Sequence, residues 1–283
     1  MADDTIAALS TPAGESAIAA IRLSGGMCSV LARECFGKKD VAPRHCTRAE
    51  YISKSGSVLD DVLFAFFKAP HSYTDEDMLE IYTHGNPYIV QTILEDLFSR
   101  GVRAATHGEF TRRAFESGRI DLSQAEAVSL MISARSEKSL AAARRQLGGE
   151  LSRRINSMCD LLVESLARIE AYIDFSDEDL PPESFFKPKE LLLDFVKNAE
   201  KLSETSRYGA VLRDGLNVSI VGEPNVGKSS LMNCMLGRDR AIVSPAAGTT
   251  RDFIVERANI SGYCVNLTDT AGLRNSADEI ESE

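Results

Sequence analysis

A glycine-rich loop that ends in lysine and serine constrains this chain more than any other feature. It reads Gly-Glu-Pro-Asn-Val-Gly-Lys-Ser over residues 222–229. A short β-branched run at residues 218–221 precedes it and predicts a strand, and an apolar stretch at residues 231–236 follows it and predicts a helix. Strand, glycine loop and helix in this order are the context of a phosphate-binding loop. We therefore expect a nucleoside-triphosphate site.

The residue types of the loop suit that chemistry. Gly222 and Gly227 let successive backbone N–H groups turn toward phosphate oxygens. Lys228 can reach the outer phosphates, and Ser229 can ligate Mg²⁺ at the positive end of the following helix. The alternative is a glycine-rich turn without a ligand, and the agreement of spacing with context argues against it.

Composition bounds the class of protein. The 283 residues are enough for two domains of roughly 100–200 residues each. No apolar run has the roughly 18 residues of a membrane span, and the N-terminus lacks a signal-peptide core, so we expect a cytoplasmic protein without a membrane partner. The net charge of −10 argues against a general nucleic-acid coat protein but allows a local basic surface.

The cysteines are scattered, without a C-x-x-C pair or a nearby histidine cluster. We expect buried, reduced thiols rather than a metal site or a disulfide framework. The six are Cys28, Cys35, Cys46, Cys159, Cys234 and Cys264.

Residues 1–118 have the pattern of one α+β unit. Strands are predicted at residues 17–23, 49–53, 58–67 and 78–82, the middle two as a hairpin, and a helix capped by Asn86 and Pro87 follows. Two polar stretches, residues 72–86 and 107–119, place charged groups beside glycines. From the residues alone, solvated loops are the favoured interpretation and a small polar ligand is the alternative. His84 and His107 are interpreted as surface or hydrogen-bonded side chains rather than metal ligands.

Residues 122–172 have a helical pattern, and another helix is expected at 188–208 after an acidic connection. Cations predominate over residues 135–154, where Arg135, Lys138, Arg144, Arg145, Arg153 and Arg154 stand against Glu137 and Glu150. Such a face can meet RNA phosphates, but a solvated helix face is the favoured interpretation.

Two later segments narrow the nucleotide site. Gly-Thr-Thr-Arg-Asp at residues 248–252 offers a threonine of the kind that a switch loop uses to complete Mg²⁺ coordination, and Asp-Thr-Ala-Gly at residues 269–272 follows a predicted strand. Together they predict a translation-factor-like GTPase fold. Leu273 replaces the water-orienting glutamine of Ras-like enzymes, so another group must act. Asp278, Glu279, Glu281 and Glu283 are the acidic candidates, and the pattern does not choose between them.

At this point the segments resemble a known family. Gly-Glu-Pro-Asn-Val-Gly-Lys-Ser-Ser from residue 222, Ala-Ile-Val-Ser-Pro-Ala-Ala-Gly-Thr-Thr-Arg-Asp from residue 241 and Asp-Thr-Ala-Gly-Leu-Arg from residue 269 are similar to the MnmE (TrmE) family of tRNA-modifying GTPases. So are Ser-Tyr-Thr-Asp-Glu-Asp from residue 72 and His-Gly-Glu-Phe-Thr-Arg-Arg-Ala-Phe from residue 107. These N-terminal motifs argue against a ribosome-assembly GTPase, which shares only the GTPase motifs.

The resemblance implies a multidomain α+β and α/β protein. Its parts would be a tetrahydrofolate-binding N-terminal domain (1–118), the first half of a helical domain (119–214) and the N-terminal part of a P-loop GTPase domain (215–283). The implied activity is potassium-dependent GTP hydrolysis that drives modification of C5 of the wobble uridine of certain tRNAs with a carboxymethylaminomethyl or aminomethyl group. The implied partners are a flavoprotein, MnmG (GidA), in a hetero-oligomer and a second copy bound through the N-terminal domain. The one-carbon unit would come from a 5-formyl or 5,10-methylene tetrahydrofolate.

The resemblance also assigns roles to residues. Arg22, Glu80 and Arg119 would bind the folate, while Lys228 and Glu281 would be catalytic, the glutamate by positioning water. Ser229 and Thr250 would hold Mg²⁺, and K⁺ would be held by Asn225, Ser244, Ala246 and Thr249. The other implied GTP contacts are Val226, Gly227, Ser230, Pro245, Ala247, Gly248, Asp269, Thr270, Ala271 and Gly272.

The family continues beyond the position of Glu283 with an Asn-Lys-x-Asp segment that reads guanine and with further strands and helices. We therefore expect a truncated member whose half-sheet exposes a strand edge. The alternative function is a folate-binding, dimerising fragment that does not turn over nucleotide because the guanine-reading segment is absent.

Overall fold

The computed structural model describes residues 4–38, 40–174, 186–222, 226–238 and 255–269. The chain forms two compact units, unit 1 (residues 1–125) and unit 2 (residues 126–283). Unit 1 is a mixed α and β domain, and unit 2 joins helices to a small mixed sheet. The predicted multidomain α+β and α/β class is confirmed. The domain bounds predicted at residues 118 and 214 stay predictions.

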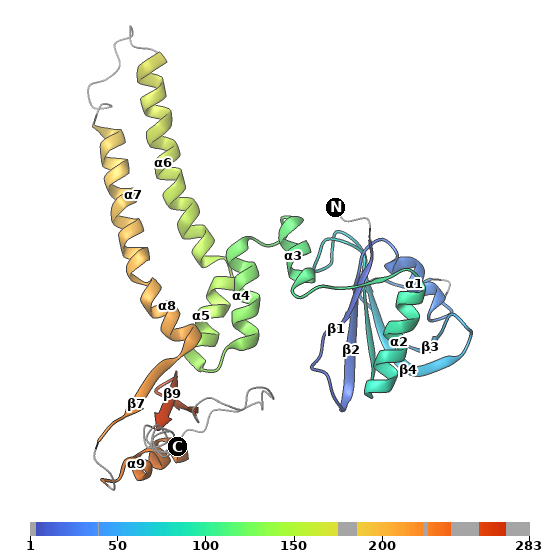
Figure 1. Cartoon of the computed structure of the whole chain (residues 1–283). Coiled ribbons are helices and arrows are strands. Elements are labelled where there is room, and N and C mark those ends of the chain that lie inside the picture. The colour runs from blue at the N-terminus through green and yellow to red at the C-terminus, as the bar shows by residue number, and fades with distance from the viewer. Residues whose placement is uncertain (1–3, 39, 175–185, 223–225, 239–254, 270–283) are drawn as a thin grey trace, which may run out of the picture. The chain divides into compact units, whose positions relative to one another are not determined.

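Unit 1 is built on a six-stranded sheet in the order β3-β4-β5-β2-β1-β6 (Figure 1). Its strands are β1 (Ile6–Leu9), β2 (Ser16–Ser24), β3 (Cys46–Ile52), β4 (Val58–Phe67), β5 (Met78–Gly85) and β6 (Arg103–Ala104). Neighbours are antiparallel except β1 and β6, which run parallel. The four predicted strands and the hairpin are confirmed. Sequence reasoning missed β1 and β6, whose lengths of 4 and 2 residues give periodicity little to act on.

The core of unit 1 lies between the sheet and the helices α1 (Cys28–Glu34) and α2 (Pro87–Ser99). Ile21 and Leu23 of β2 and Ile81 of β5 pack there with Leu31 of α1 and Ile93 of α2, all of them buried. Since side chains alternate along a strand, the intervening residues of β2 and β5 face the other side of the sheet. That second face carries the polar cluster described below.

The predicted cap of α2 is confirmed. The Asn86 side chain accepts hydrogen bonds from the backbone N–H groups of Tyr88 (2.9 Å) and Ile89 (3.4 Å), and Pro87 occupies the first helical position. A further helix, α3 (Glu109–Glu116), follows the strands of this unit.

The helical region predicted at residues 122–172 consists of three helices. They are α4 (Leu122–Ser133), α5 (Glu137–Leu147) and α6 (Glu150–Asp174). Ser136 is the N-cap of α5, and it and Ser139 form a capping box in which each side chain accepts a hydrogen bond from the backbone N–H of the other. A Gly148–Gly149 turn separates α5 from α6. The second predicted helix likewise divides into α7 (Lys187–Glu204) and α8 (Ser206–Asp214).

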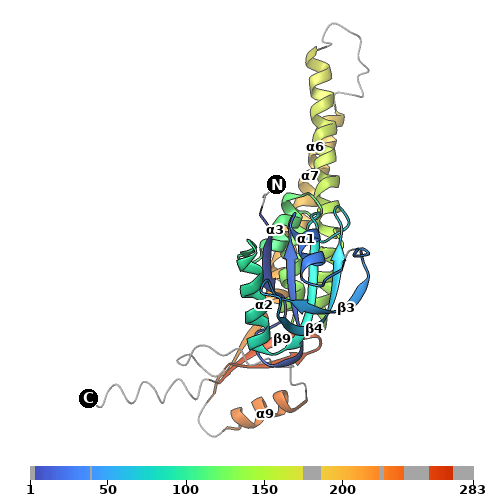
Figure 2. The ribbon, with the colours of Figure 1, turned by 90° about the vertical axis from the view of Figure 1, so that its right-hand side faces the viewer.

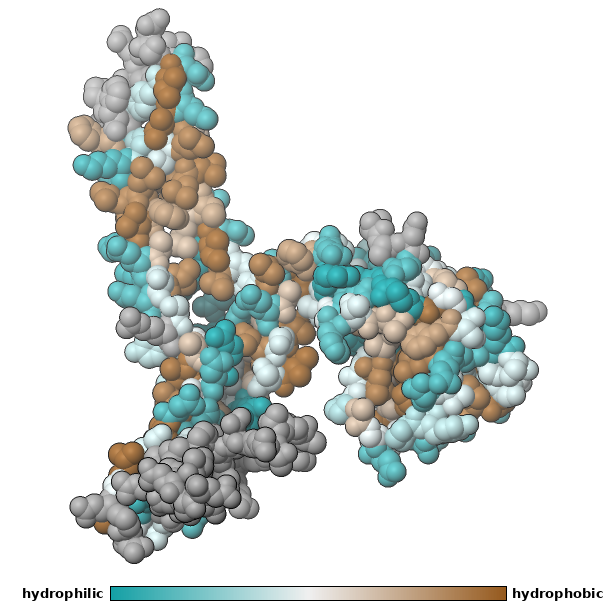
Figure 3. Space-filling model, viewed as in Figure 1, coloured by the Kyte–Doolittle hydropathy of each residue, from teal (hydrophilic) through white to brown (hydrophobic). Residues whose placement is uncertain are grey.

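Helices α6 and α7 lie side by side (Figures 1 and 2). They bury few side chains in the described chain, namely Ser165 on α6 and Pro188 and Leu191 on α7. Apolar side chains are instead exposed along both helices, as the brown areas of Figure 3 show. Those on α6 are Ile155, Val163, Leu166, Ile169 and Ile173, and those on α7 are Leu192, Leu193 and Val196.

The remaining elements of unit 2 form a sheet in the order β7-β9-β8 with one helix. They are β7 (Leu216–Ile220), α9 (Lys228–Arg238), β8 (Val255–Ile260) and β9 (Tyr263–Asp269). β7 and β9 are parallel, and β8 and β9 form an antiparallel hairpin. Met232 and Leu236 of α9 pack on Val265 and Leu267 of β9. The predicted strand before Gly222 and the predicted helix after the loop are confirmed. Among the described strands β7 is an edge, in agreement with the expected exposed edge.

The expectation of buried cysteines is wrong for half of them. Cys28, Cys35 and Cys264 are buried, whereas Cys46, Cys159 and Cys234 are exposed. All six are free thiols. Burial raises the pKa of the Cys35 thiol above its usual range, so this cysteine behaves as a small apolar side chain.

Candidate functional site

The phosphate loop begins at the end of β7 and leads into α9. The first residue of α9 is Lys228, whose Nζ donates to the Gly222 carbonyl oxygen at 3.0 Å across the loop. Gly227 has φ +94°, a conformation that side-chain-bearing residues rarely adopt. Lys228 is therefore both the first residue of a helix and part of a glycine-rich loop. An anion-binding site uses this arrangement because the N-terminus of a helix carries partial positive charge.

Strand β9 brings Asp269, a second predicted residue of the nucleotide site, to the end of β7 at which the phosphate loop begins. In the parallel pairing of β7 and β9, Ile220 lies opposite Asp269. The loop leaves the sheet directly after Ile220, so the carboxyl ends of both strands meet where the loop starts. Open α/β sheets bind their ligands at such an edge. The backbone position of Asp269 therefore agrees with a role beside the phosphate loop.

Several predicted residues of this site lie outside the described residues. They are Asn225, Ser244, Pro245, Ala246, Ala247, Gly248, Thr249, Thr250, Thr270, Ala271, Gly272 and Glu281. Val226 is exposed within the loop, and Ser230 is exposed in the first turn of α9. Ser229 directly follows Lys228 in that turn. The predicted contacts of all these residues with GTP, Mg²⁺ and K⁺ stay predictions.

A polar cluster lies on the face of the unit 1 sheet opposite the core. Arg22 of β2 and Glu80 of β5 are paired in register, and their side chains form an ion pair at 2.8 Å. The Tyr82 hydroxyl donates to the second oxygen of Glu80 at 2.5 Å. Burial, with the hydrogen bond to Glu80, raises the pKa of Tyr82 to about 12, so the hydroxyl keeps its proton at neutral pH. Two of the three predicted folate-binding residues are thus in contact.

Aromatic rings flank this pair. The Arg22 guanidinium lies 5.8 Å from the centroid of the Tyr73 ring and 5.9 Å from that of the Phe110 ring. The Tyr73 hydroxyl is hydrogen-bonded to Thr111 of α3 at 3.0 Å. Sequence reasoning missed both rings as site residues, although they stand in the two polar stretches that it singled out.

Arg119, the third predicted folate-binding residue, does not contact Arg22 or Glu80. Its guanidinium pairs with Asp75 at 3.1 Å, two residues from Tyr73 in the same loop. Both partners are partly exposed. The cluster therefore offers the Glu80 carboxylate, the Arg22 guanidinium and two aromatic rings, and the Arg119–Asp75 pair stands in the loop that carries Tyr73. This set fits a flat heterocycle with hydrogen-bonding edges and an anionic tail.

Buried ion pairs hold α3 beside this cluster. Arg113 of α3 is 4% exposed and pairs with Glu76 at 3.0 Å, with Asp4 at 2.7 Å and with Glu109 at 3.2 Å. Glu109 is 1% exposed and also accepts from Arg103 at 2.6 Å. The hydrogen bond from Arg103, with further bonds from Thr106, holds the pKa of Glu109 well below its usual range. The Glu-x-x-x-Arg spacing at 109–113 was the available sequence signal for this contact.

Unit 2 has a second feature, a contact between α5 and the β8–β9 turn. The Lys138 ammonium lies 3.7 Å from the centroid of the Tyr263 ring. The Lys138 backbone N–H donates to the Gly262 carbonyl oxygen at 3.3 Å. This contact joins the helices to the strand that ends at Asp269.

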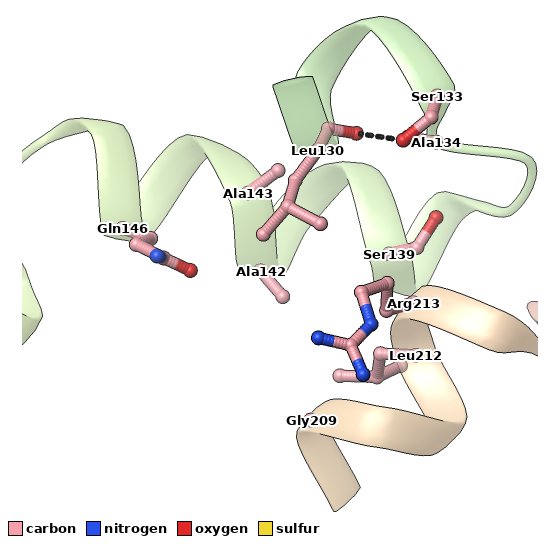
Figure 4. Close-up of a pocket in the computed structure, with 10 residues that line it drawn as sticks. All are labelled: Leu130, Ser133, Ala134, Ser139, Ala142, Ala143, Gln146, Gly209, Leu212 and Arg213. Carbon is pink, nitrogen blue, oxygen red and sulfur yellow. Dashed lines mark hydrogen bonds between the residues drawn. The ribbon is translucent and has the colours of Figure 1, made fainter. Parts of the chain in front are cut away.

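A small cavity of about 80 Å³ lies among α4, α5 and α8 (Figure 4). Leu130, Ala142, Ala143, Gly209 and Leu212 form much of its wall, and Arg213 stands at its side. The space is too small for a nucleotide or a folate. Within the described part of the chain, no cluster of three or more histidine, cysteine or acidic side chains is arranged to hold a metal ion. Nor does any described helix have the length and apolarity needed to cross a membrane.

Comparison with known families covers both units. The family model described as "GTP-binding protein TrmE N-terminus" matches residues 5–119, and the model described as "MnmE helical domain" matches residues 122–282. The second match spans more than half of the chain and includes the phosphate loop.

Known proteins agree with the family models. The chain is 51% identical over 280 residues to the "tRNA modification GTPase MnmE" of Opitutus terrae, an alignment that covers 99% of the chain and 62% of that protein. It is 43% identical over 279 residues to the protein of the same name from Aquifex aeolicus, with 98% of the chain and 62% of that protein covered. The chain thus spans about 62% of the length of these relatives. From the N-terminal motifs, the helices and the phosphate loop alike, the chain belongs to the MnmE family.

Proposed function

We propose that this protein is a GTPase that acts in tRNA modification. The observation that carries the proposal is the pairing of Ile220 with Asp269, because it sets the start of the phosphate loop beside the first residue of the predicted Asp-Thr-Ala-Gly motif, at the carboxyl ends of two parallel strands. The printed names of the relatives supply the substrate class. In this proposal Lys228 binds the outer phosphates and stabilises the charge that develops during transfer.

The finer proposal assigns the reaction at the RNA. Together with the flavoprotein MnmG (GidA), the protein modifies C5 of the wobble uridine of certain tRNAs. GTP is hydrolysed with Mg²⁺ held by Ser229 and Thr250 and with K⁺ held by Asn225, Ser244, Ala246 and Thr249. Bound K⁺ would supply the positive charge that an arginine finger supplies elsewhere. Glu281, the acidic residue that the family resemblance assigns, positions the attacking water. The side chain of Leu273, which follows Gly272, has no hydrogen-bonding group for this task.

Unit 1 supplies the one-carbon donor in this proposal. A tetrahydrofolate derivative binds with its pterin edge on Glu80, which accepts hydrogen bonds from N–H groups. Arg22 and Arg119 bind carbonyl or carboxylate oxygens, and the rings of Tyr73 and Phe110 cover the flat heterocycle. The contact of Arg22 with Glu80 at 2.8 Å supports this role because both groups are already fixed on neighbouring strands.

Nucleoside mass spectrometry of tRNA tests the function. A strain that lacks the gene should lose the C5 modification of the wobble uridine. The wild-type gene and a Lys197→Ala control, whose change lies on the exposed side of α7, should restore the modification, whereas Lys228→Ala should not. Normal modification in the deletion strain would contradict the proposal.

The ion requirement is tested separately. GTP hydrolysis should be faster in potassium than in sodium at equal ionic strength, and this difference should shrink in Asn225→Ala. Equal rates in the two salts would remove potassium from the proposal and leave the GTPase assignment standing.

The alternative proposal is a folate-binding, dimerising fragment without nucleotide turnover. The contacts among Arg22, Glu80, Tyr82 and Tyr73 all lie within unit 1 and favour folate binding as a property of that unit. Binding of folate without binding of GTP would select this alternative.

A further inference from the structure

Four arginines surround the turn between α5 and α6. Arg144 and Arg145 stand in the last turn of α5, and Arg153 and Arg154 follow the start of α6 at Glu150. All four are exposed. Because the turn between the helices is the dipeptide Gly148–Gly149, these guanidinium groups lie around one short bend of the chain. We call this set the arginine turn.

The arginine turn has few carboxylates to neutralise it. Within the described residues, Arg145 approaches Glu150 only to 3.9 Å, and no carboxylate lies within 4 Å of Arg144 or Arg154. Arg153 donates to the Gly148 carbonyl oxygen at 2.8 Å, which fixes the bend but leaves its charge uncompensated. The chain as a whole carries a net charge of −10, so the arginine turn is a locally cationic surface on an acidic protein.

Favourable interaction with a helix end explains the positions of Arg144 and Arg145 but not those of Arg153 and Arg154. Cations in the last turn of α5 interact favourably with the negative end of that helix. Arg153 and Arg154 are the fourth and fifth residues of α6, beyond its first turn, so the helix dipole does not explain their placement. Four like charges around one turn also repel one another. An anionic partner would offset this repulsion.

We propose that the arginine turn binds the phosphate backbone of RNA. Guanidinium groups present forked donors that match phosphate oxygens, and exposed arginines around a bend can reach successive phosphates. Residues 135–154 contain no aromatic side chain on which a base could stack. The contact is therefore to the backbone and independent of sequence, and it positions the RNA rather than reading it. The identity of that RNA as tRNA rests on the proposed function.

Salt-dependent binding of an unmodified tRNA transcript to the 283-residue chain tests the proposal. The variant Arg144→Gln/Arg145→Gln/Arg154→Gln keeps Arg153 and its bond to Gly148, so the bend is preserved. The matched control, Lys189→Gln/Lys197→Gln/Lys201→Gln, removes the same charge from exposed positions of α7. Circular dichroism should show equal helix content in all three proteins.

We expect the arginine variant to bind at least about tenfold more weakly at about 100 mM salt, with the slope of log K against log salt reduced by about 2 to 3, since each lost phosphate contact removes roughly 0.9. The lysine control should keep the wild-type affinity and slope. Unchanged binding by the arginine variant, equal loss in both variants or no binding by the wild-type chain would each overturn the proposal. So would intact RNA binding with loss of a protein partner, which would assign the surface to an acidic protein.

The proposed function and the RNA-binding role of the arginine turn can be refuted separately. If the deletion strain modifies its tRNA normally but the arginine variant still loses RNA affinity, the phosphate surface stands and the modification role falls. If modification depends on Lys228 but the arginine variant binds tRNA normally, only the arginine turn is refuted.

Discussion

The two units bury their apolar side chains to different degrees. In unit 1, large side chains such as Ile21, Leu79 and Ile93 are fully buried in one cluster between the sheet and two helices. In unit 2, α6 and α7 leave side chains such as Val163 and Leu193 more than half exposed. Unit 1 therefore contains the apolar contacts that stabilise it, whereas the long helices of unit 2 contribute little burial of their own.

The difference extends to the candidate sites. In unit 1 the polar cluster is fixed by a buried ion-pair network around Arg113 and Glu109, so its groups are positioned before a ligand arrives. In unit 2 the phosphate loop stands on a small sheet with a small core, and Lys138 of α5 contacts the β8–β9 turn of that sheet through Tyr263. The first site should be robust to mild destabilisation and the second sensitive to it.

The largest expected loss of stability comes from a substitution in the core of unit 1. Leu79→Ala removes a fully buried side chain from unit 1 and should lower the free energy of unfolding by about 2–5 kcal/mol. Leu193→Ala, at a position 59% exposed on α7, should change it by less than about 0.5 kcal/mol. Urea unfolding followed by circular dichroism measures both. Equal effects would show that α7 is covered in solution.

A smaller loss is expected from the ion-pair network. Glu109→Gln removes the charge that accepts hydrogen bonds from Arg103 and Arg113 and should lower the free energy of unfolding by about 1.5–3 kcal/mol. Glu116→Gln, on the exposed end of α3, is the matched control and should change little. A loss as small as that of the control would mean that the network does not stabilise unit 1.

The same carboxylate predicts a pH dependence. The pKa of Glu109 is lower in the folded protein than the ordinary value of 4.5, so the folded state binds its proton less well than the unfolded state. Its contribution to stability is present above about pH 4.5 and is lost as the pH falls toward the folded pKa. Unfolding measured between pH 7 and pH 3 should therefore show a steeper loss for the wild type than for Glu109→Gln. Parallel curves would contradict this assignment.

The smallest expected loss of stability comes from the contact between Lys138 and Tyr263 in unit 2. Tyr263→Leu keeps an apolar side chain but removes the ring beneath Lys138, and should destabilise the β8–β9 hairpin by about 0.5–1 kcal/mol. Lys138→Met should have a similar effect, and the double variant should lose no more than either single variant. Hydrogen exchange of the β9 amides measures the change. Additive losses would show that the two side chains do not interact.

Local patterns predicted much of this fold because the deciding signals are short-range. The β-branched run before Gly222 and the cap at Asn86 lie within a few residues of the elements that they specify. The pairing of Ile220 with Asp269 and that of Arg22 with Glu80 join residues far apart in the chain, and register across a sheet is not written in either segment alone. The division of residues 122–172 into three helices depended on Ser136 and the glycine turn, which act as breaks only where tertiary packing permits.

The central claim is that each unit binds its own ligand, a folate at Glu80 and a nucleotide at Lys228. Calorimetric titration of the wild-type chain, Glu80→Gln and Lys228→Ala with 5-formyl-tetrahydrofolate and with GTP tests it most directly. The account predicts that Glu80→Gln weakens folate binding at least about tenfold, the loss of one charged hydrogen bond, and leaves GTP binding unchanged. Lys228→Ala should abolish GTP binding and leave folate binding unchanged. Loss of both ligands in either variant, or retention of both ligands in both variants, would contradict it.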